Sequence, residues 1–216
     1  MDWSCGQTTY QREFNVMDTT EFWKERGHEY IKPTTGGEFP EGWDVKSYLT
    51  ELCDGKLVTE IGCGTGRLAP AFPPEHYIGI DICTSALEIA EENNRDYKYI
   101  LHNQGDSYPQ ADVRLVYTVL LHIDDDCIGD FIENLCQDPA TWHTLRVIVA
   151  EIMGRKWRRP GNPPVFNREA DEYITLFEKC GFELEYNNEK PYEKYADHLL
   201  GPAIITFLTF RKKDYE

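Results

Sequence analysis

A glycine-rich turn constrains the fold of this chain more than any other feature of its sequence. The glycines of the segment Glu60-Ile-Gly-Cys-Gly-Thr-Gly66 come directly after residues 57–61, which we interpret as a buried strand. Alternate glycines leave no side chains where a ligand must approach the backbone. A helix expected directly after the turn would add unpaired N–H groups and a partial positive charge. The turn therefore predicts a binding site for a nucleotide-like cofactor or a carboxylate.

The rest of the chain alternates strand-like and helix-like segments, a pattern that favours a mostly parallel sheet covered by helices. Helices are expected at 44–53, at 125–136, and at 167–180 with Asn167 as the N-cap. The last two strands should be antiparallel neighbours because few residues separate them. We therefore predict an α/β fold: a Rossmann-like seven-stranded mostly parallel sheet flanked by helices, with the last strand antiparallel. The strands are expected at 57–61, 77–82, 97–102, 113–120, 146–152, 182–186 and 203–211.

The first 42 residues differ from the remainder because they are polar, aromatic and rich in turn formers. Within them, residues 18–26 can form a short helix that Gly27 would end. We interpret residues 1–42 as a helical and loop cover of the active site, and 43–216 as the cofactor-binding domain. Trp23 and Tyr30 are candidate substrate contacts on this cover. The alternative, that these aromatic side chains only cover the edge of the sheet, stays open.

Charge and composition limit the classes of function. The 216 residues carry a net charge of −16, which repels phosphate backbones and makes long nucleic acids unlikely partners. No apolar run approaches the roughly 18 to 20 residues that cross a bilayer, and the first residues lack a secretory pattern. We therefore expect a cytoplasmic protein with no membrane partner. The seven cysteines are scattered without a C-x-x-C pair, so neither a disulfide framework nor a metal site is predicted.

Two residues distinguish this glycine turn from the dinucleotide-binding turn of NAD and FAD proteins, whose pattern is G-x-G-x-x-G/A. Arg67 occupies the last position of that pattern and is too large for the close helix–strand contact that glycine or alanine allows there. Asp81 ends the second expected strand, where a carboxylate can accept hydrogen bonds from both hydroxyls of a ribose. The turn and Asp81 together favour a cofactor that contains a ribose but is neither NAD nor FAD.

The turn, Asp81, Gly105-Asp106 and the run Val116-Tyr-Thr-Val-Leu-Leu-His-Ile123 resemble the ordered motifs of class I S-adenosylmethionine (SAM)-dependent methyltransferases of the small-molecule type. The resemblance spans about residues 43–211 and implies SAM as the cofactor. By this resemblance Glu60 faces the methionine amino group, Asp81 holds the ribose and Asp106 meets the adenine. The cofactor-binding residues that it implies are Glu60, Gly62, Cys63, Gly64, Gly66, Asp81, Ile82, Gln104, Asp106, Ser107, Tyr117 and Thr118.

Candidate residues for the methyl acceptor follow the fourth and fifth strands. His122 could be a general base for a hydroxyl acceptor, or a packed histidine with no proton-transfer role. The loop Arg155-Lys-Trp-Arg-Arg159 could hold an anionic group, or it could be a solvated loop that balances acidic neighbours. Glu151 and Arg168 flank that loop and could bind substrate or pair with each other. We interpret the run Asp124–Asp126 as a charge cluster at a helix start rather than as metal ligands.

The sequence therefore predicts a SAM-dependent methyltransferase that acts on an oxygen or nitrogen of a small polar metabolite, anionic or sugar-like in character. No N/D-P-P-Y/F/W or Pro-Cys motif follows the fourth strand, which argues against methylation of DNA bases and of glutamine. Protein or tRNA methylation and a non-catalytic SAM-binding module remain as alternatives. The catalytic candidate is His122, and the substrate-binding candidates are Trp23, Tyr30, Glu151, Arg155 and Arg168.

Overall fold

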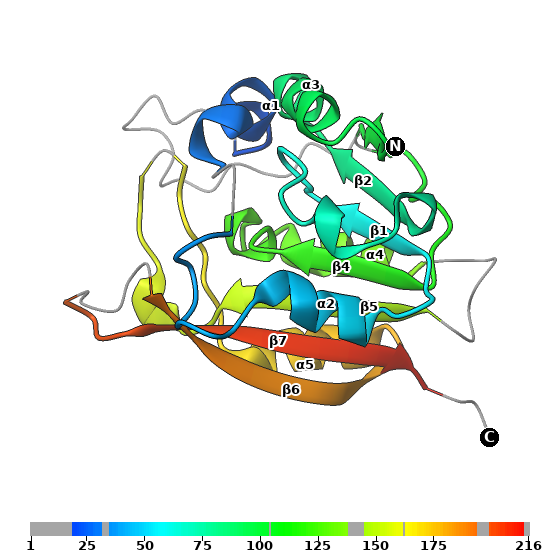
Figure 1. Cartoon of the computed structure of the whole chain (residues 1–216). Coiled ribbons are helices and arrows are strands. Elements are labelled where there is room, and N and C mark those ends of the chain that lie inside the picture. Colours follow the sequence, from blue (N-terminus) through cyan, green and yellow to red (C-terminus); the bar gives the residue numbers. More distant parts are fainter. Residues whose placement is uncertain are drawn as a thin grey trace.

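One sheet of seven strands organises the computed structural model, which describes residues 19–31, 35–103, 105–137, 145–161, 163–193 and 199–213. The strands are β1 (Val58–Ile61), β2 (Tyr77–Asp81), β3 (Lys98–Leu101), β4 (Val113–Tyr117), β5 (Arg146–Ile152), β6 (Phe182–Tyr192) and β7 (Ala203–Lys212). Their spatial order is β3-β2-β1-β4-β5-β7-β6 (Figure 1). Only β7 runs opposite to the other described strands, pairing antiparallel with both β5 and β6. The predicted fold class is confirmed.

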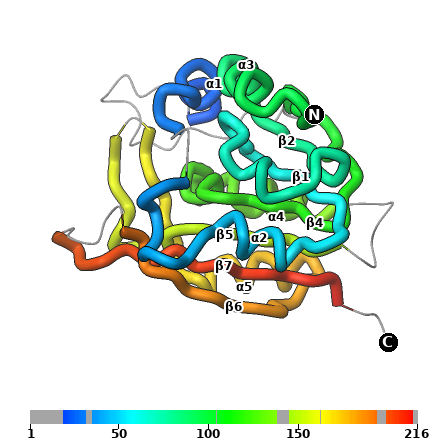
Figure 2. Tube along the Cα trace, in the orientation of Figure 1, coloured from blue at the N-terminus to red at the C-terminus, as the bar shows by residue number. Residues whose placement is uncertain are grey.

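Helices cover both faces of the sheet. They are α1 (Thr19–Tyr30), α2 (Val45–Leu52), α3 (Thr84–Asn93), α4 (Ile128–Cys136) and α5 (Ala170–Lys179), with short 3-10 helices η2 (Ala69–Ala71), η3 (Pro74–His76), η4 (Leu120–His122) and η5 (Arg155–Trp157). Helix α2 packs on one face of the sheet, and α4 and α5 pack on the other (Figure 1). Helix α1 lies beside α3 (Figure 2). None of the helices in the described ranges is long and apolar enough to cross a membrane.

The central strands are apolar because both of their faces are buried. In β5, Ile148 and Ala150 pack with α2, whereas Val147 and Val149 pack with α4 and α5. Strand β4 contains one charged residue, Arg114, which is only 1% exposed. Its guanidinium donates to the carbonyls of Leu135 and Gln137 at 2.6 and 2.9 Å, so the C-terminal end of α4 neutralises the buried cation.

The helix predicted over 18–26 does not end at Gly27 but continues to Tyr30. A Cβ at Gly27 would lie 3.4 Å from the Cβ of Cys83, at the N-terminal end of α3. The glycine therefore allows α1 and α3 to approach closely, and it does not stop the helix. The end predicted at Gly27 is wrong because local propensity gives way to packing between helices.

Further boundaries differ from the prediction, and the structure explains three of them. Strand β4 stops at Tyr117 because Thr118 has a φ of 54°, which an extended strand does not accommodate. Helix α5 begins at Ala170 rather than after Asn167; Glu169 is its N-cap residue, and the backbone N–H of Glu169 bonds to the Glu172 carboxylate at 3.0 Å. Strand β6 extends to Tyr192 because it pairs with β7 over its full length.

Candidate functional site

The glycine turn joins β1 to β2 at the carboxyl edge of the sheet. Gly62, Gly64 and Gly66 have φ values of 72°, 55° and 71°, a region that L side chains rarely adopt. A Cβ at Gly62 would lie 2.5 Å from the Val119 side chain, and a Cβ at Gly66 would collide with the Tyr99 hydroxyl. Backbone conformation and close packing therefore both require glycine in this turn.

The α-helix expected directly after the turn is absent from this described segment. Residues 64–68 form turns, and the short η2 follows them. Pro70, Pro73 and Pro74 explain this difference, because proline lacks the N–H that an α-helix interior needs. A helix dipole therefore contributes little here, and the turn depends on its own backbone and on the neighbouring strand.

The carboxylate of Asp81 lies beside the glycine turn. Asp81 ends β2, which pairs with β1, and its Oδ2 accepts the Gly64 N–H at 2.8 Å. Its Oδ1 accepts the Cys83 N–H at 2.9 Å. Burial raises the pKa of the Asp81 carboxyl, and these backbone hydrogen bonds oppose that shift. The structure therefore brings together the two features that predicted the cofactor site.

Glu60 is buried on β1, next to the turn. Its Oε2 accepts the Tyr77 hydroxyl at 2.5 Å. Burial raises the pKa of the Glu60 carboxyl to about 8, although the hydrogen bond from Tyr77 and the charge of Arg67 lower it. The carboxyl is therefore mostly protonated at neutral pH in this structure.

The remaining residues that the resemblance implies lie along the same edge or next to it. Cys63 is buried in the turn, and Ile82 follows Asp81. The N–H of His102 bonds to the Asp81 carbonyl, so the segment that carries Asp106 and Ser107 starts beside β2. Asp106 is exposed, and its carboxylate accepts the Asn103 N–H at 2.8 Å. Gln104 lies outside the described residues.

A buried ion pair connects the N-terminal part of the chain to the glycine turn. Arg67 donates to Glu38 at 2.6 Å, and the Glu38 side chain is 1% exposed. The hydroxyls of Tyr117 and Tyr192 also donate to this carboxylate, at 3.3 and 3.2 Å. The Arg67 guanidinium lies over the Tyr117 ring, 5.0 Å from its centroid. Tyr117 thus directs its hydroxyl to Glu38. Glu38 was not among the predicted site residues, because no local motif surrounds it.

The end of α1 lies on the glycine turn. Ile31 Cδ1 is 2.6 Å from the position of a Cβ at Gly64. The Trp23 ring packs on the His122 ring with a centroid distance of 4.4 Å, whereas Tyr30 is 48% exposed and packs on Trp23. The N-terminal segment therefore covers the glycine turn and the end of β4 at once.

His122 lies at the end of η4, beyond β4. The Pro164 carbonyl accepts a hydrogen bond from its ring, and burial lowers the pKa of the imidazole to about 4. The charge of Arg159 lowers the pKa further. Nδ1 of His122 is buried and has no hydrogen-bond partner among the residues that the structure describes. The ring is therefore neutral at physiological pH.

Glu151 and Arg168 support η4 from inside the protein. Glu151 is fully buried, and its Oε1 accepts the N–H groups of Val119 and Leu120 at 2.8 and 2.6 Å. Burial raises the pKa of its carboxyl to about 8. Arg168 is 2% exposed and donates to the carbonyls of Leu120 and Ile123 and to Asp125. Both side chains thus position the segment that carries His122.

The basic loop is engaged with acidic neighbours. Arg155 pairs with Glu172, and Arg158 forms a two-pronged ion pair with Asp125 at 2.6 and 2.8 Å. Lys156 donates to the Leu200 carbonyl at 3.1 Å. Among the described residues, no group of acidic, histidine or cysteine side chains could hold a metal ion.

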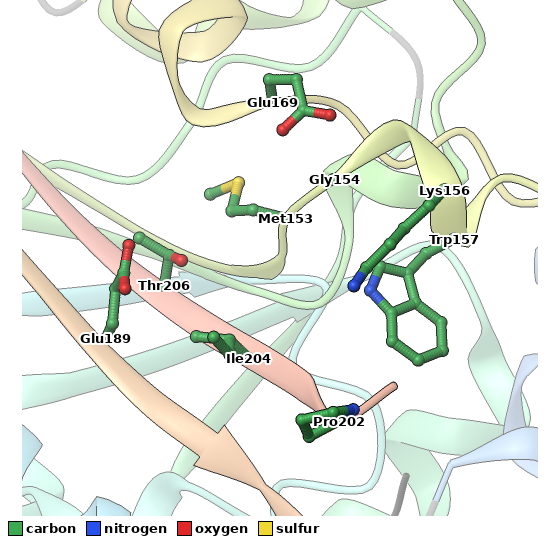
Figure 3. A pocket seen from close by; sticks show the side chains of 9 residues that line it. All are labelled: Met153, Gly154, Lys156, Trp157, Glu169, Glu189, Pro202, Ile204 and Thr206. Atoms are coloured by element: carbon green, nitrogen blue, oxygen red, sulfur yellow. The ribbon is translucent and has the colours of Figure 1, made fainter. Parts of the chain in front are cut away.

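A cavity of about 290 Å³ opens beside the basic loop, at the ends of β5 and β7. Figure 3 shows Lys156 and Trp157 on one side of it, and Thr206 and Glu189 on the other. The cavity therefore combines one cation, one indole and two carboxylates, with Glu169 as the second acidic residue. The sequence identified its basic side but not the contributions of β6 and β7.

Comparisons with known proteins agree with this geometry. The family model described as "Methyltransferase domain" matches residues 59–128. Probable tRNA methyltransferase 9B of Homo sapiens is 30% identical over 90 residues, which are 42% of this chain and 18% of that protein. This chain therefore spans under a fifth of the length of the curated relatives that it matches.

Solved structures share the fold over most of the chain. Magnesium protoporphyrin IX methyltransferase from Synechocystis PCC 6803 with bound SAM superposes with a TM-score of 0.63 and 12% identity, over 93% of this chain and 100% of that one. The 1,6-didemethyltoxoflavin-N1-methyltransferase of Burkholderia thailandensis gives a TM-score of 0.57 and 16% identity, over 78% and 77% of the two chains. The methyltransferase-domain match over residues 59–128 contains the glycine turn and Asp81 and agrees with the predicted family and cofactor, and the solved structures confirm the predicted fold.

Proposed function

We propose that this chain, built on a class I SAM-dependent methyltransferase domain, methylates an oxygen or nitrogen atom of a small polar metabolite, anionic or sugar-like in character. The observation that carries the proposal is the Asp81 carboxylate, held 2.8 Å from the backbone nitrogen of Gly64 in a turn of three positive-φ glycines. Such a turn lets a ligand approach the backbone, and the carboxylate suits a ribose diol. The residues present therefore fit the cofactor.

Each residue of the turn has a role in this proposal. Gly62, Gly64 and Gly66 would lie along the methionine and ribose, Asp81 would hold the ribose hydroxyls, and Glu60 would face the amino group. SAM supplies a methyl group that is already activated on a sulfonium sulfur. The protein must then align the acceptor and exclude water, and positioning alone can lower a barrier by roughly 7 to 11 kcal/mol. Ile31 and α1 are placed to exclude water.

Charge supports a small acceptor. The net charge of −16 opposes the approach of a polynucleotide. The loop that could have docked one has Arg155 and Arg158 in ion pairs with Glu172 and Asp125. The cavity beside this loop has the size of a small-molecule site and carries Lys156 at its rim. These features favour a small polar acceptor over a polynucleotide, and Lys156 is the cation of the cavity that could meet an anionic group.

A tRNA acceptor is the second candidate, because the matched human relative is described as a probable tRNA methyltransferase. This acceptor would need to overcome the acidic surface, and its methylation would fall steeply with salt. A small acceptor predicts transfer that is nearly insensitive to salt. Protein substrates would behave as an intermediate case, since docking would again use the basic loop.

The test is incubation of the protein with methyl-labelled SAM and a metabolite extract, followed by mass spectrometry. A labelled low-molecular-weight product that is absent with Asp81→Ala would support the proposal. Label found only in tRNA or protein in parallel incubations would overturn the small-metabolite assignment. SAM binding without any labelled product would favour a non-catalytic SAM-binding module.

A further inference from the structure

Two buried polar atoms belong to rings that pack together where α1 meets η4. Trp23 Nε1 and His122 Nδ1 are both inaccessible, and neither has a hydrogen-bond partner in the described part of the chain. Their rings are 4.4 Å apart and inclined by 56°. Buried polar groups are nearly always paired in proteins, so two unpaired groups at one contact indicate a ligand that would pair them.

The tautomer of His122 makes the two atoms complementary. The Pro164 carbonyl can only accept, so the ring nitrogen that bonds to it carries the hydrogen. We assign this hydrogen bond to Nε2, because Nδ1 has no hydrogen-bond partner among the described residues. In the neutral ring Nδ1 then carries a lone pair, whereas Trp23 Nε1 is a donor only. The contact offers one donor and one acceptor to the same ligand.

Both elements that carry these atoms also touch the glycine turn. Val119, just before η4, lies against Gly62, and Ile31, just after α1, lies against Gly64. Helix α1 and η4 thus meet beside the segment that would hold the methionine part of SAM. Glu151 and Arg168 fix η4 at this place through its backbone.

We infer that the methyl acceptor is the oxygen of a hydroxyl group that accepts a hydrogen bond from Trp23 Nε1 and gives its proton to His122 Nδ1. The inference rests on the proposed function and narrows its acceptor. A hydroxyl oxygen has two lone pairs, so one can accept from Trp23 while the other attacks. A neutral amine has a single lone pair, which cannot do both.

The transfer balances with this assignment. The acceptor oxygen exchanges its bond to hydrogen for a bond to the methyl carbon, the sulfur keeps the electron pair of the broken carbon–sulfur bond, and the proton passes to Nδ1. His122 is then a catalytic base, and Trp23 is a donor that orients the acceptor. Pro164 and Arg168 are positioning residues.

The first experiment identifies the atom that receives the methyl group. SAM binding is measured by calorimetry, and the product formed from ¹³C-methyl SAM and a metabolite extract is analysed by NMR. A methyl ether or ester supports the inference. An N-methyl or C-methyl product overturns it while the proposed function stands, and bound SAM without any product overturns both.

Variants and spectroscopy test the two side chains. We expect His122→Asn to lower kcat at least 100-fold and Trp23→Phe to lower kcat/KM about 10-fold, whereas His76→Asn and Trp43→Phe act as matched controls with wild-type rates. In ¹⁵N NMR of the wild-type protein at pH 7, His122 should be protonated on Nε2 and not on Nδ1. Phenol should shift the Nδ1 and Trp23 Nε1 resonances, and toluene should not. The opposite tautomer, or equal shifts with toluene, would overturn the inference even if a variant failed to fold.

Discussion

The carboxylate of Asp81 accepts the backbone N–H of Gly64 at 2.8 Å. This hydrogen bond crosses from β2 to the turn that follows β1, so the residue assigned to the ribose also sets the shape of the turn. One substitution at Asp81 should therefore change both the ligand contact and the conformation that presents the backbone.

Asp81→Asn should weaken SAM binding by a factor of about 10 or more. Hydrogen bonds to a charged group contribute about 1.5 to 3 kcal/mol, and the neutral amide loses that charge. Calorimetry measures the affinity, and Asp96→Asn is the control because Asp96 is exposed on a loop. Unchanged affinity in a protein that unfolds normally would remove Asp81 from the cofactor site.

Ile31→Ala should speed SAM association several-fold. Ile31 Cδ1 lies 2.6 Å from the place of a Cβ at Gly64, so the isoleucine covers the face of the turn that a ligand would approach. A shorter side chain leaves that face more open. Stopped-flow fluorescence follows the rate, and Ile204→Ala, which shortens an exposed isoleucine on β7, provides the comparison. A slower association would mean that Ile31 packs on the bound cofactor instead of blocking it.

Glu38→Gln should destabilise the protein by about 3 to 5 kcal/mol, because it leaves the Arg67 cation buried without its anion. Urea unfolding measures the loss. Glu29→Gln removes the acid of an exposed ion pair with Arg26 and should leave the unfolding midpoint unchanged. Equal effects of the two substitutions would show that the buried ion pair contributes no more than a surface pair.

His122 should make stability depend on pH. Its folded pKa of about 4 lies below the ordinary histidine value of 6.5, so the unfolded chain binds the proton first as the pH falls. The contribution of His122 to the free energy of unfolding should be constant above pH 6.5 and should fall by about 3 kcal/mol as the pH drops through 6.5 towards 4. His122→Gln should lack this decline relative to wild type in urea unfolding at pH 7, 6 and 5. The same pH dependence of the free energy of unfolding in wild type and His122→Gln would show that the imidazole is not buried as a neutral ring.

Glu60 should make the free energy of unfolding fall as the pH rises, opposite to the effect of His122. Its folded pKa of about 8 exceeds the ordinary glutamate value of 4.5, so its contribution to stability is fully present below pH 4.5 and is lost as the pH rises through 8. Between pH 6 and pH 8.5 the loss should be about 3 kcal/mol. Glu60→Gln mimics the protonated carboxyl and should remove this difference, while the similar slope from Glu151 remains in both proteins. An identical pH dependence of unfolding in the two proteins would indicate an ionised Glu60.

The sequence was sufficient for the sheet and for the glycine turn with Asp81 beside it. Buried parallel strands need apolar residues on both faces, so the runs around β1, β4 and β5 are visible without any knowledge of packing. The glycine turn and Asp81 are visible because each follows a strand directly. Conformation in these segments depends on neighbours within a few residues.

Features that join distant parts of the chain could not be predicted in this way. The partnership of Glu38 with Arg67, the contact of Trp23 with His122 and the role of Gly27 between two helices have no local pattern. The prolines after the glycine turn prevent the α-helix that the turn led us to expect, and only the short η2 forms there. The sequence by itself determined the fold class and the cofactor turn, because both depend on periodicity and on local backbone freedom. Only the tertiary structure decided which side chains meet over that turn, because burial and pairing depend on how α1, η4 and the sheet pack together.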